Sequence, residues 1–576
     1  MRVRSRRSIL GGVARLALGV TLLVVSGVGG LAQTPGIDRV LPYAVAPGQA
    51  QTITFFGSGL ASPTELWTSF GGRCEPLTNS VQDPGERQSW RVFVPPDASP
   101  GIGALRLATV NGVSRWRLIM IDDLPTISAT GSNRTASAAQ SIRPPIAVDG
   151  ASGELTSDFY RFTAKRGQRL AVEVVAQRLG SALDPVLRLL DAQGRELAYC
   201  DDFPGLGGDA RLEYRFGETG DYFVEVRDVR YQGGKDYFYR LRAGDFPLHA
   251  VPFPLGAKRG TVAKFSLPGR RAGKELQLQL KMPDATGERF AGLRFARGQG
   301  SCAARIAVSD LPEVLEVEPN DAPTNATPFA VPACLNGRFD RSKDRDYFSF
   351  SVVKGERLVF NVKTRSLGSP CDVFMRVCRA DGSKLADADA NGAGEGALTN
   401  SFNETGKYLL RLEALDRQGG PDQIYRVEVN RFEPGFTLSV EADRADAAPG
   451  GQFELKVACV RSAGFDGPIT LSLTGGAGSF QLSDNVISAK TNETTLRVTV
   501  PRHLQPGQRI RFGVVGRGQA GGAERAATAS TLPALRKEFP ELLYPPAALD
   551  GAFDLGVTRP EAAKSATAKS SRVTSD

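Results

Sequence analysis

The sequence of 576 residues is poor in histidine, the side chain that enzymes most often use for proton transfer. Its two histidines, His249 and His503, stand beside prolines in stretches that predict turns or strand edges. An HExxH zinc motif, a GxSxG nucleophile elbow and a GxxxxGK[ST] phosphate loop are all missing. We therefore expect no catalytic activity. Paired carboxylates of the glycosidase type remain open among the 62 acidic residues.

Paired cysteine motifs and long apolar runs are also missing. The seven cysteines form no CxxC pair, and their odd number leaves at least one thiol free or paired outside the chain. On one straight strand, Cys371 and Cys378 would point to opposite faces, so we predict no bond between them and assign no disulfides. After residue 32, no apolar run reaches the roughly 20 residues that cross a bilayer. The cysteines are Cys74, Cys200, Cys302, Cys334, Cys371, Cys378 and Cys459.

Blocks of positive charge are missing outside the first 32 residues. That segment holds five arginines and no acid, so it accounts for more than half of the formal net charge of +9. The remaining excess is small and spread along the chain. This distribution gives no electrostatic footprint for nucleic acid, and we expect no such partner.

The first 32 residues have the pattern of an export signal: a basic start, the apolar run "LALGVTLLVVSGVGG" and small residues at its end. "SRRSIL" resembles the twin-arginine signal that exports folded proteins, and an ordinary secretory signal is the alternative. Gly30 and Ala32 stand where a signal peptidase reads, which predicts cleavage after Ala32. A retained anchor is disfavoured because the run is short. We expect a periplasmic, cell-surface or secreted protein.

Short alternating apolar runs, separated by glycine and proline, predict an all-β chain. In "RLAVEVV", for example, Leu170, Val172 and Val174 fall on one face of a strand. Many of these runs belong to a long internal repeat. "SDFYRF" matches "RDYFSF", so that Phe162 aligns with Phe350, and "ETGDYFVEV" matches "ETGKYLLRL". The match continues upstream through "DDLPTI" and "SDLPEV", so the repeated unit is a pair of domains.

Several motifs in one order carry a family resemblance. The stretch 316–429 contains "EVEPNDAPTNAT", "DRDYFSF", "ADG", "ETGKYLLRL" and "YRVEV". It resembles the bacterial pre-peptidase C-terminal (PPC) domain, a β-sandwich carried by secreted proteases and many other exported proteins. The internal repeat extends this resemblance to a second copy upstream. "LPYAVAPGQAQTITFFGSGL" near the start resembles the opening of an IPT/TIG domain, a small immunoglobulin-like sandwich.

These features predict an all-β fold of tandem β-sandwich domains, immunoglobulin-like and PPC-like, with a cleaved signal and a disordered tail. The tail is predicted because periodicity is lost where Ala, Ser, Lys and Pro accumulate. The predicted units are a signal peptide (1–32), an IPT/TIG-like sandwich (33–128), a first PPC-like sandwich (129–245), a small β-domain that is a degenerate repeat of the first (246–312), a second PPC-like sandwich (313–431), an immunoglobulin-like sandwich (432–533) and the tail (534–576).

An acidic segment opens the second PPC-like unit. Related sandwiches at the ends of bacterial collagenases bind calcium through a Glu-x-Glu-x-Asn-Asp segment and another Asp about twenty residues later. The resemblance implies a structural Ca²⁺ site, because hard oxygen ligands suit this ion. An exposed acidic linker is the alternative. The implied ligands are Glu316, Glu318, Asn320, Asp321 and Asp344.

The internal repeat supplies a comparison within the chain. The corresponding segment of the first copy, "TISATGSNRTASAAQ", has no carboxylate, and Thr156 stands where the second copy has Asp344. The aspartates before the aromatic strands, Asp158 and Asp346, are present in both copies, which indicates a role in folding. We therefore expect a calcium site in the second copy and none in the first.

The function predicted from these features is binding or spacing, without catalysis, by an exported multidomain protein at the cell surface or in the periplasm. The expected partner is an extracellular protein or polysaccharide of unknown identity. No transmembrane span is expected after signal removal. The alternative is an accessory role, in which the chain presents substrate to a secreted protease or other hydrolase, or stabilises it.

Overall fold

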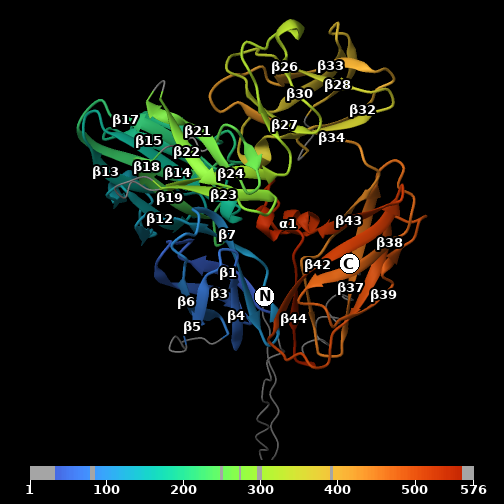
Figure 1. The fold of residues 1–576 in the computed structure, drawn as a ribbon. Helices are drawn as coiled ribbons and strands as arrows, with labels where there is room; N and C mark the ends of the chain where they lie inside the picture. The colour runs from blue at the N-terminus through green and yellow to red at the C-terminus, as the bar shows by residue number, and fades with distance from the viewer. Residues whose placement is uncertain are drawn as a thin grey trace, which may run out of the picture.

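The computed structural model describes residues 33–77, 85–246, 251–271, 274–294, 301–389 and 394–560 (Figure 1). The regular secondary structure of the described residues is almost entirely strand, with one α-helix and a few 3₁₀ turns, so the predicted all-β class is confirmed. Among these residues, no helix is long and apolar enough to span a membrane. The predicted signal (1–32), His249 and residues 561–576 lie outside the described residues.

The first domain is a sandwich of two sheets around a core that includes Phe55 and Trp90. Trp90 is 2% exposed and points to the same face of its strand as the buried Val92. One sheet has the order β1-β3-β6-β5 (Gly36–Leu41, Ala50–Ser58, Arg87–Phe93, Arg73–Pro76). The other has the order β2-β9-β7-β4 (Ala44–Val45, Arg117–Ile121, Gly101–Thr109, Pro63–Thr68), with β8 (Gly112–Val113) beside β7.

Sandwich 1 follows and consists of two five-stranded sheets. The first sheet has the order β10-β12-β19-β14-β17 (Thr126–Ser128, Ile146–Ala151, Phe238–Gly244, Arg169–Val175, Arg211–Arg215). The second has the order β11-β13-β18-β15-β16 (Gln140–Ser141, Asp158–Ala164, Gly220–Asp228, Pro185–Asp191, Glu196–Cys200). The turns η1 (Ala136–Ala138) and η2 (Gln177–Leu179) connect strands.

Sandwich 2 has the same arrangement further along the chain. Its sheets have the orders β25-β27-β34-β29-β32 (Glu313–Leu315, Ala333–Arg338, Ile424–Arg431, Arg357–Lys363, Ala397–Ser401) and β26-β28-β33-β30-β31 (Thr327–Pro328, Asp346–Val352, Gly406–Ala414, Val373–Arg379, Lys384–Ala388). The turns are η3 (Pro323–Asn325) and η4 (Arg365–Leu367). Each strand has a counterpart in sandwich 1, in the same sheet position.

The register of the two sandwiches agrees with the sequence repeat. Phe162 on β13 pairs with Tyr222 on β18, and Phe350 on β28 pairs with Tyr408 on β33. All four rings belong to the cores between the sheets. The repeat therefore predicts the shared topology correctly, because its aromatic positions fill the same space in both sandwiches.

One strand of sandwich 1 is buried on both faces. Leu170, Val172 and Val174 face the core as predicted, yet Ala171 and Glu173 on the opposite face are also buried. Leu124 of the preceding segment and Phe246 cover Ala171. Alternation marks the face toward the core correctly, but it does not show that another part of the chain covers the second face.

A small domain lies between the two sandwiches. Its sheets are β20-β24-β23 (Gly256–Lys258, Ser301–Ser309, Gly287–Arg294) and β21-β22 (Val262–Arg271, Lys274–Lys281). The pairing of β20-β24-β23, one parallel and one antiparallel, repeats that of β2-β9-β7. Phe265 on β21 is buried, as is Phe55 on β3, the residue that it matches in the sequence.

The C-terminal sandwich contains the strand order β36-β44-β42-β43-β35-β37-β41-β39, and β38 pairs with β40 and β42. Two short helical segments, α1 (Leu532–Glu538) and η5 (Ala547–Leu549), precede its last strand. The strands are β35 (Phe436–Val440), β36 (Arg444–Ala447), β37 (Gln452–Arg461), β38 (Ile469–Gly475), β39 (Gln481–Ser483), β40 (Val486–Ile487), β41 (Glu493–Thr499), β42 (Arg509–Ala520), β43 (Ala523–Ser530) and β44 (Phe553–Val557).

The prediction of a disordered tail from residue 534 onward is wrong for residues 534–557. β44 pairs with β36 and β42, inside the sandwich. Leu535 and Phe539 are buried against Trp116 of the first domain. Composition alone missed this segment because its few apolar residues are covered by a distant part of the chain.

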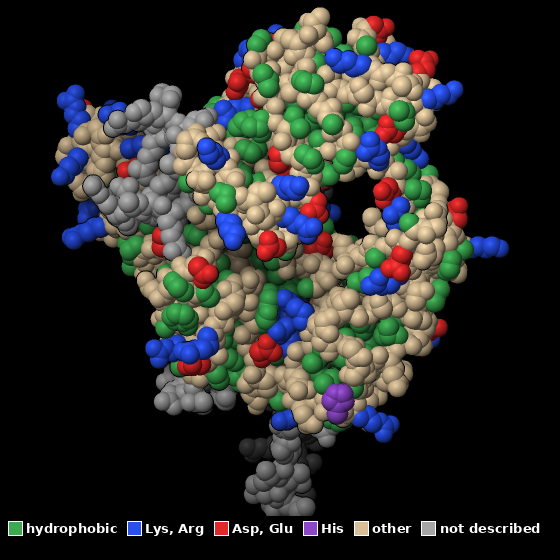
Figure 2. Space-filling model, viewed as in Figure 1, with side chains coloured by type: hydrophobic (Ala, Val, Ile, Leu, Met, Phe, Trp, Pro, Cys, Tyr) green, Lys and Arg blue, Asp and Glu red, His purple; other side chains and the backbone are tan. Residues whose placement is uncertain are grey.

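The first domain and the C-terminal sandwich pack side by side, so the ends of the described chain lie close together (Figure 1). The guanidinium of Arg106 is fully buried and donates to Asp443 and, at 2.7 Å, to Asp554. Arg509 pairs with Glu65 at 2.7 Å. These contacts join the first and the last of the five domains. Figure 2 shows an opening between sandwich 2 and the C-terminal sandwich.

Candidate metal centre

Three carboxylates converge at one end of sandwich 2. Ligand oxygens of Glu316, Glu318 and Asp346 lie within 4.8 Å of one another. Asp346 begins β28, and the two glutamates follow β25. Because β25 pairs in parallel with β27, the segment that follows it is held across the end of the sandwich and against Asp346.

The hydrogen bonds of this cluster leave its carboxylates short of donors. The Tyr425 hydroxyl lies 2.6 Å from Asp346 Oδ2 and 3.1 Å from Glu316 Oε2. A tyrosine hydroxyl has one proton, so it satisfies one of these acids at a time. Glu316 Oε1 accepts from the backbone nitrogen of Arg338 at 2.7 Å. The cluster therefore holds more negative charge than its neighbours neutralise.

Asn320 adds an amide to the same place and is fully buried. Its side-chain oxygen faces the carboxylates, an orientation that suits coordination of a shared cation. After rotation of the amide, the nitrogen would donate to Glu318 at 3.2 Å and to Asp346 at 3.0 Å. One orientation therefore suits a bound ion and the other suits its absence.

The pKa values of the clustered carboxyl groups also favour a bound cation. Burial raises the pKa of Glu316 to about 7, and burial together with the charge of Glu316 raises the pKa of Asp346 further. Burial also raises the pKa of Glu318. Such shifts show that ionised carboxylates are destabilised here, and a cation among them would restore their ordinary acidity.

The structure places the other two predicted ligands at the edge of the cluster. The side chain of Asp344 is buried, and its Oδ2 accepts from the backbone nitrogen of Asp340 at 2.8 Å. Its Oδ1 has no hydrogen-bond partner and lies 3.4 Å from the Arg341 guanidinium. Asp321 is 39% exposed at its side chain and also pairs with Arg341. The exposed Arg341 thus neutralises the rim and leaves the inner acids unpaired.

Sequence reasoning did not include Asp346 among the candidate ligands. Because Asp158 is its counterpart in the other copy, the residue was assigned to folding alone. The available signal was its position, two residues after Asp344 and at the first position of a strand. Its carboxylate faces the glutamates, whereas the more obvious Asp321 turns toward Arg341.

The equivalent place in sandwich 1 carries its own cation. The backbone oxygen of Asn133 accepts from Phe159, as that of Asn320 accepts from Tyr347. Asp158 accepts from the Tyr239 hydroxyl at 2.7 Å, as Asp346 accepts from Tyr425. The Arg134 guanidinium then donates to Asp158 Oδ1 at 2.7 Å. The residue that follows the buried asparagine is thus Arg134 in sandwich 1 and Asp321 in sandwich 2.

The described cysteines offer no further site of this kind. All six of them are free, and Cys371 lies before β30 (Val373–Arg379), the strand that contains Cys378. His503, the histidine within the described residues, is exposed.

Comparison with known proteins gives local similarities. No family model matches the chain. A probable subtilase-type serine protease of Deinococcus radiodurans is 40% identical over 70 residues, which is 12% of this chain and 9% of that protein. The matched part is therefore about a tenth of that relative's length.

Two solved structures are similar at low identity. The pre-peptidase C-terminal domain of a Bacillus anthracis collagenase is 17% identical, with 18% of this chain and 93% of that domain covered and a TM-score of 0.16. The N-terminal four immunoglobulin domains of Dscam1 are 11% identical, with 84% and 96% covered and a TM-score of 0.16.

Proposed function

We propose that sandwich 2 binds one calcium ion through Glu316, Glu318, Asn320 and Asp346, with Asp344 next to them. The observation that carries this proposal is the convergence of three carboxylates that form no ion pair within the described residues, whereas in sandwich 1 the half-buried Arg134 pairs with Asp158 at 2.7 Å. Asp321, implied by the resemblance, would act at the rim, where it fixes Arg341. Carboxylate and amide oxygens are the ligands that calcium prefers.

The role of such an ion is structural. Glu316 and Glu318 belong to the segment that enters sandwich 2 from the small domain, and Asp346 belongs to a core strand. An ion held by both would fix the entry segment on the sandwich and stiffen the joint between the two domains. The chain's own residues position the ligands, and no reaction is assigned to the ion.

A thermal unfolding experiment tests the ion. Calcium at about 100 times its dissociation constant adds about 2.7 kcal/mol to the stability of the state that binds it. We expect the melting temperature of the sandwich 2 transition to rise with calcium and to fall back with a chelator. The Glu316→Gln/Glu318→Gln variant should lose the response. An equal rise in that variant would assign the effect to another site.

We further propose that the whole chain is an exported, non-catalytic binding or spacing protein. Its domains are consecutive sandwiches with charged side chains of both signs interspersed on the visible surface (Figure 2), as suits a soluble extracellular scaffold. The proposed partner is an extracellular protein or polysaccharide. Affinity capture on the immobilised chain should recover the partner from an extracellular fraction. A chelator wash should then release the partner if its binding depends on the calcium-stiffened joint.

Catalysis would contradict this proposal. Hydrolysis of a protein or polysaccharide panel by the purified chain, retained after removal of trace proteases, would overturn the non-catalytic assignment. The accessory role is the second candidate, and the 70-residue similarity to a probable subtilase-type serine protease favours it. In that case the chain should accelerate a partner protease on a folded substrate and leave a short peptide substrate unaffected.

Export is tested at the N-terminus. The small residues Gly30 and Ala32 support cleavage before Gln33, so sequencing of the mature chain should begin there. Replacing Arg6 and Arg7 by lysine should block export if the twin-arginine route is used. Normal export of that variant would assign the ordinary secretory route, and a mature chain that begins at Met1 would contradict cleavage.

A further inference from the structure

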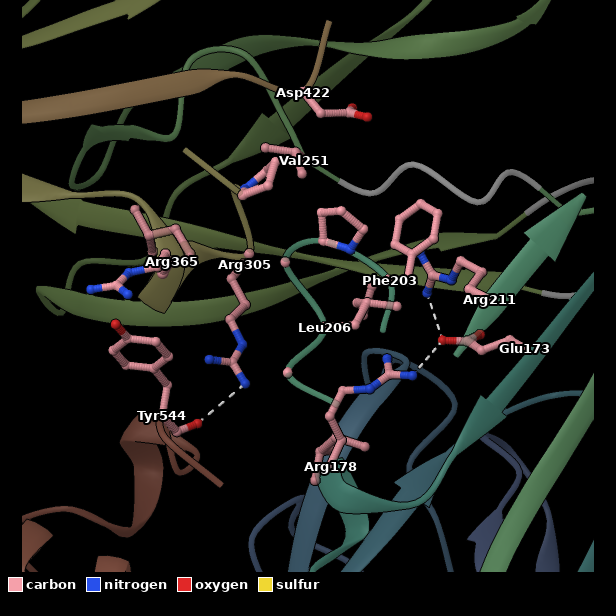
Figure 3. Close-up of a pocket in the computed structure, with 18 of the residues that line it drawn as sticks. Glu173, Arg178, Phe203, Leu206, Arg211, Val251, Arg305, Arg365, Asp422 and Tyr544 are labelled. Carbon is pink, nitrogen blue, oxygen red and sulfur yellow. Dashed lines mark hydrogen bonds and ion pairs between the residues drawn. The ribbon is translucent and has the colours of Figure 1, made fainter. Parts of the chain in front are cut away.

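A cavity of about 430 Å³ lies at the meeting point of the domains, and none of the residues of the acidic cluster lines it (Figure 3). This volume is within the range of pockets that hold small molecules. No single domain builds it. Its lining includes residues 203–207 of sandwich 1, Phe290 and Arg305 of the small domain, residues 365–370 and 419–423 of sandwich 2, and residues 541–544 after α1.

Arginine dominates the charge of this cavity. Five arginines and three acidic residues are among the lining side chains of the described chain. Three of the arginines share one acid, because Glu173 pairs at 2.6 Å with each of Arg178, Arg211 and Arg242. These arginines hold the pKa of Glu173 well below its usual range despite its burial. Glu173 therefore remains an anion that is fully occupied within the wall.

Arg305 is different, because the structure shows no ion pair for it within the described residues. Its guanidinium donates to the backbone oxygens of Ser366 at 3.0 Å and Tyr544 at 3.5 Å. Figure 3 shows the side chain pointing into the cavity, with the bond to Tyr544. Burial lowers the pKa of Arg305, and the negative charge of Glu288 opposes that effect. A guanidinium with two neutral acceptors retains the capacity to bind an anion.

The rest of the lining mixes apolar side chains with polar ones such as Gln177, Gln423 and Glu541. The Phe290 ring lies 5.3 Å from the Arg305 guanidinium carbon, so the cation is backed by an aromatic face. Across the cavity, the lining side chains of Phe203, Leu206 and Val251 are apolar (Figure 3). Asp422, which would repel an anion, is drawn at the far edge from Tyr544.

We propose that this cavity binds a small organic anion, a carboxylate with an apolar body. Its carboxylate pairs with Arg305, and its body packs between Phe203, Leu206 and Val251. Since the walls come from several domains, the bound molecule contacts all of them at once. This inference goes beyond the proposed calcium site and does not depend on it.

Fluorine NMR on the full mature chain tests this site with 4-fluorophenylacetate as the probe. We expect line broadening that saturates with protein concentration. The neutral analogue 2-(4-fluorophenyl)ethanol should bind about tenfold more weakly because it cannot pair with Arg305. Acetate, which lacks the apolar body, should not displace the probe at equal concentration.

Two variants separate charge from shape. Arg305→Gln should weaken binding about tenfold, and Arg305→Lys should restore part of it because the charge returns without the planar fork. Leu206→Trp should fill the apolar side and abolish binding even if the arginine variants fold poorly. Arg73→Gln, at a side chain 78% exposed in the first domain, is the matched control.

Several results would overturn the proposal. Absence of broadening with the unmutated chain at millimolar probe would do so. Equal affinity for the acid and the alcohol would remove the role of Arg305. Unchanged binding in Leu206→Trp would place the probe elsewhere on the molecule.

Discussion

At the residue scale, the two sandwiches use one aspartate in two electrostatic settings. Asp158 and Asp346 begin equivalent strands, and each accepts from a tyrosine hydroxyl. Asp158 is neutralised by Arg134, whereas Asp346 faces Glu316 and Glu318. The same fold position therefore serves as an internal ion pair in one copy and as a proposed cation site in the other.

The first prediction concerns pH in the absence of calcium. Because the folded-state pKa values of Glu316 and Asp346 are raised, the folded chain binds more protons than the unfolded chain above about pH 4.5. Stability should therefore fall as pH rises from there through about 7. Calcium, which replaces those protons, should flatten the fall.

Denaturant unfolding of sandwich 2 across this pH range measures the effect. Glu316→Gln/Asp346→Asn removes the two groups and should flatten the profile without calcium. A profile equally steep in that variant would mean that other groups set the pH dependence.

The second prediction concerns the built-in cation of sandwich 1. Arg134→Gln leaves the buried carboxylate of Asp158 without its positive partner and should cost about 1–3 kcal/mol. The loss should be the same with and without calcium. Arg161→Gln, on the same sandwich at an exposed position, should change stability by less than about 0.5 kcal/mol. Full rescue of Arg134→Gln by calcium would instead show that an ion can replace the guanidinium.

At the element scale, the order of the C-terminal segment depends on contacts with the first domain. Leu535 is fully buried and Leu543 is 42% exposed, although both belong to the same short stretch. Leu535→Ala should cost about 2–5 kcal/mol, and Leu543→Ala should stay within about 0.5 kcal/mol. Chemical unfolding and limited proteolysis near residue 531 measure the difference. Equal proteolysis of both variants would contradict docking of this segment.

The elements also show what sequence reasoning can and cannot reach. Strands such as β29 follow from local alternation, and the shared topology follows from repeated aromatic positions such as Phe162 and Phe350. Both are local signals. The docking of Leu535 on Trp116 and the turn of Asp346 toward Glu316 depend on residues far apart in the chain. Patterns in a short stretch of neighbouring residues cannot reveal these contacts, because the two partners of each pair lie in different parts of the sequence.

At the scale of the whole molecule, a buried ion network joins the first and last domains. Asp443 and Asp554 of the C-terminal sandwich both meet Arg106 of the first domain. Arg106→Met removes one cationic partner from each carboxylate, although Asp443 keeps Arg444 and Asp554 keeps Arg509, and it should cost about 1.5–3 kcal/mol of domain association. Small-angle X-ray scattering should then show a larger radius of gyration, with Arg73→Met as an exposed control. An unchanged radius would mean that apolar contacts such as those of Trp116 close the molecule without the network.

The central claim is that sandwich 2 holds one calcium ion and sandwich 1 holds none. Isothermal titration of the full mature chain with calcium, alongside its matched variants Asp346→Asn and Asp158→Asn, tests it most directly. The account predicts one ion per chain for the unmutated protein, no binding for Asp346→Asn and unchanged binding for Asp158→Asn. No heat of binding to the unmutated chain at millimolar calcium, or equal binding by Asp346→Asn, would contradict it.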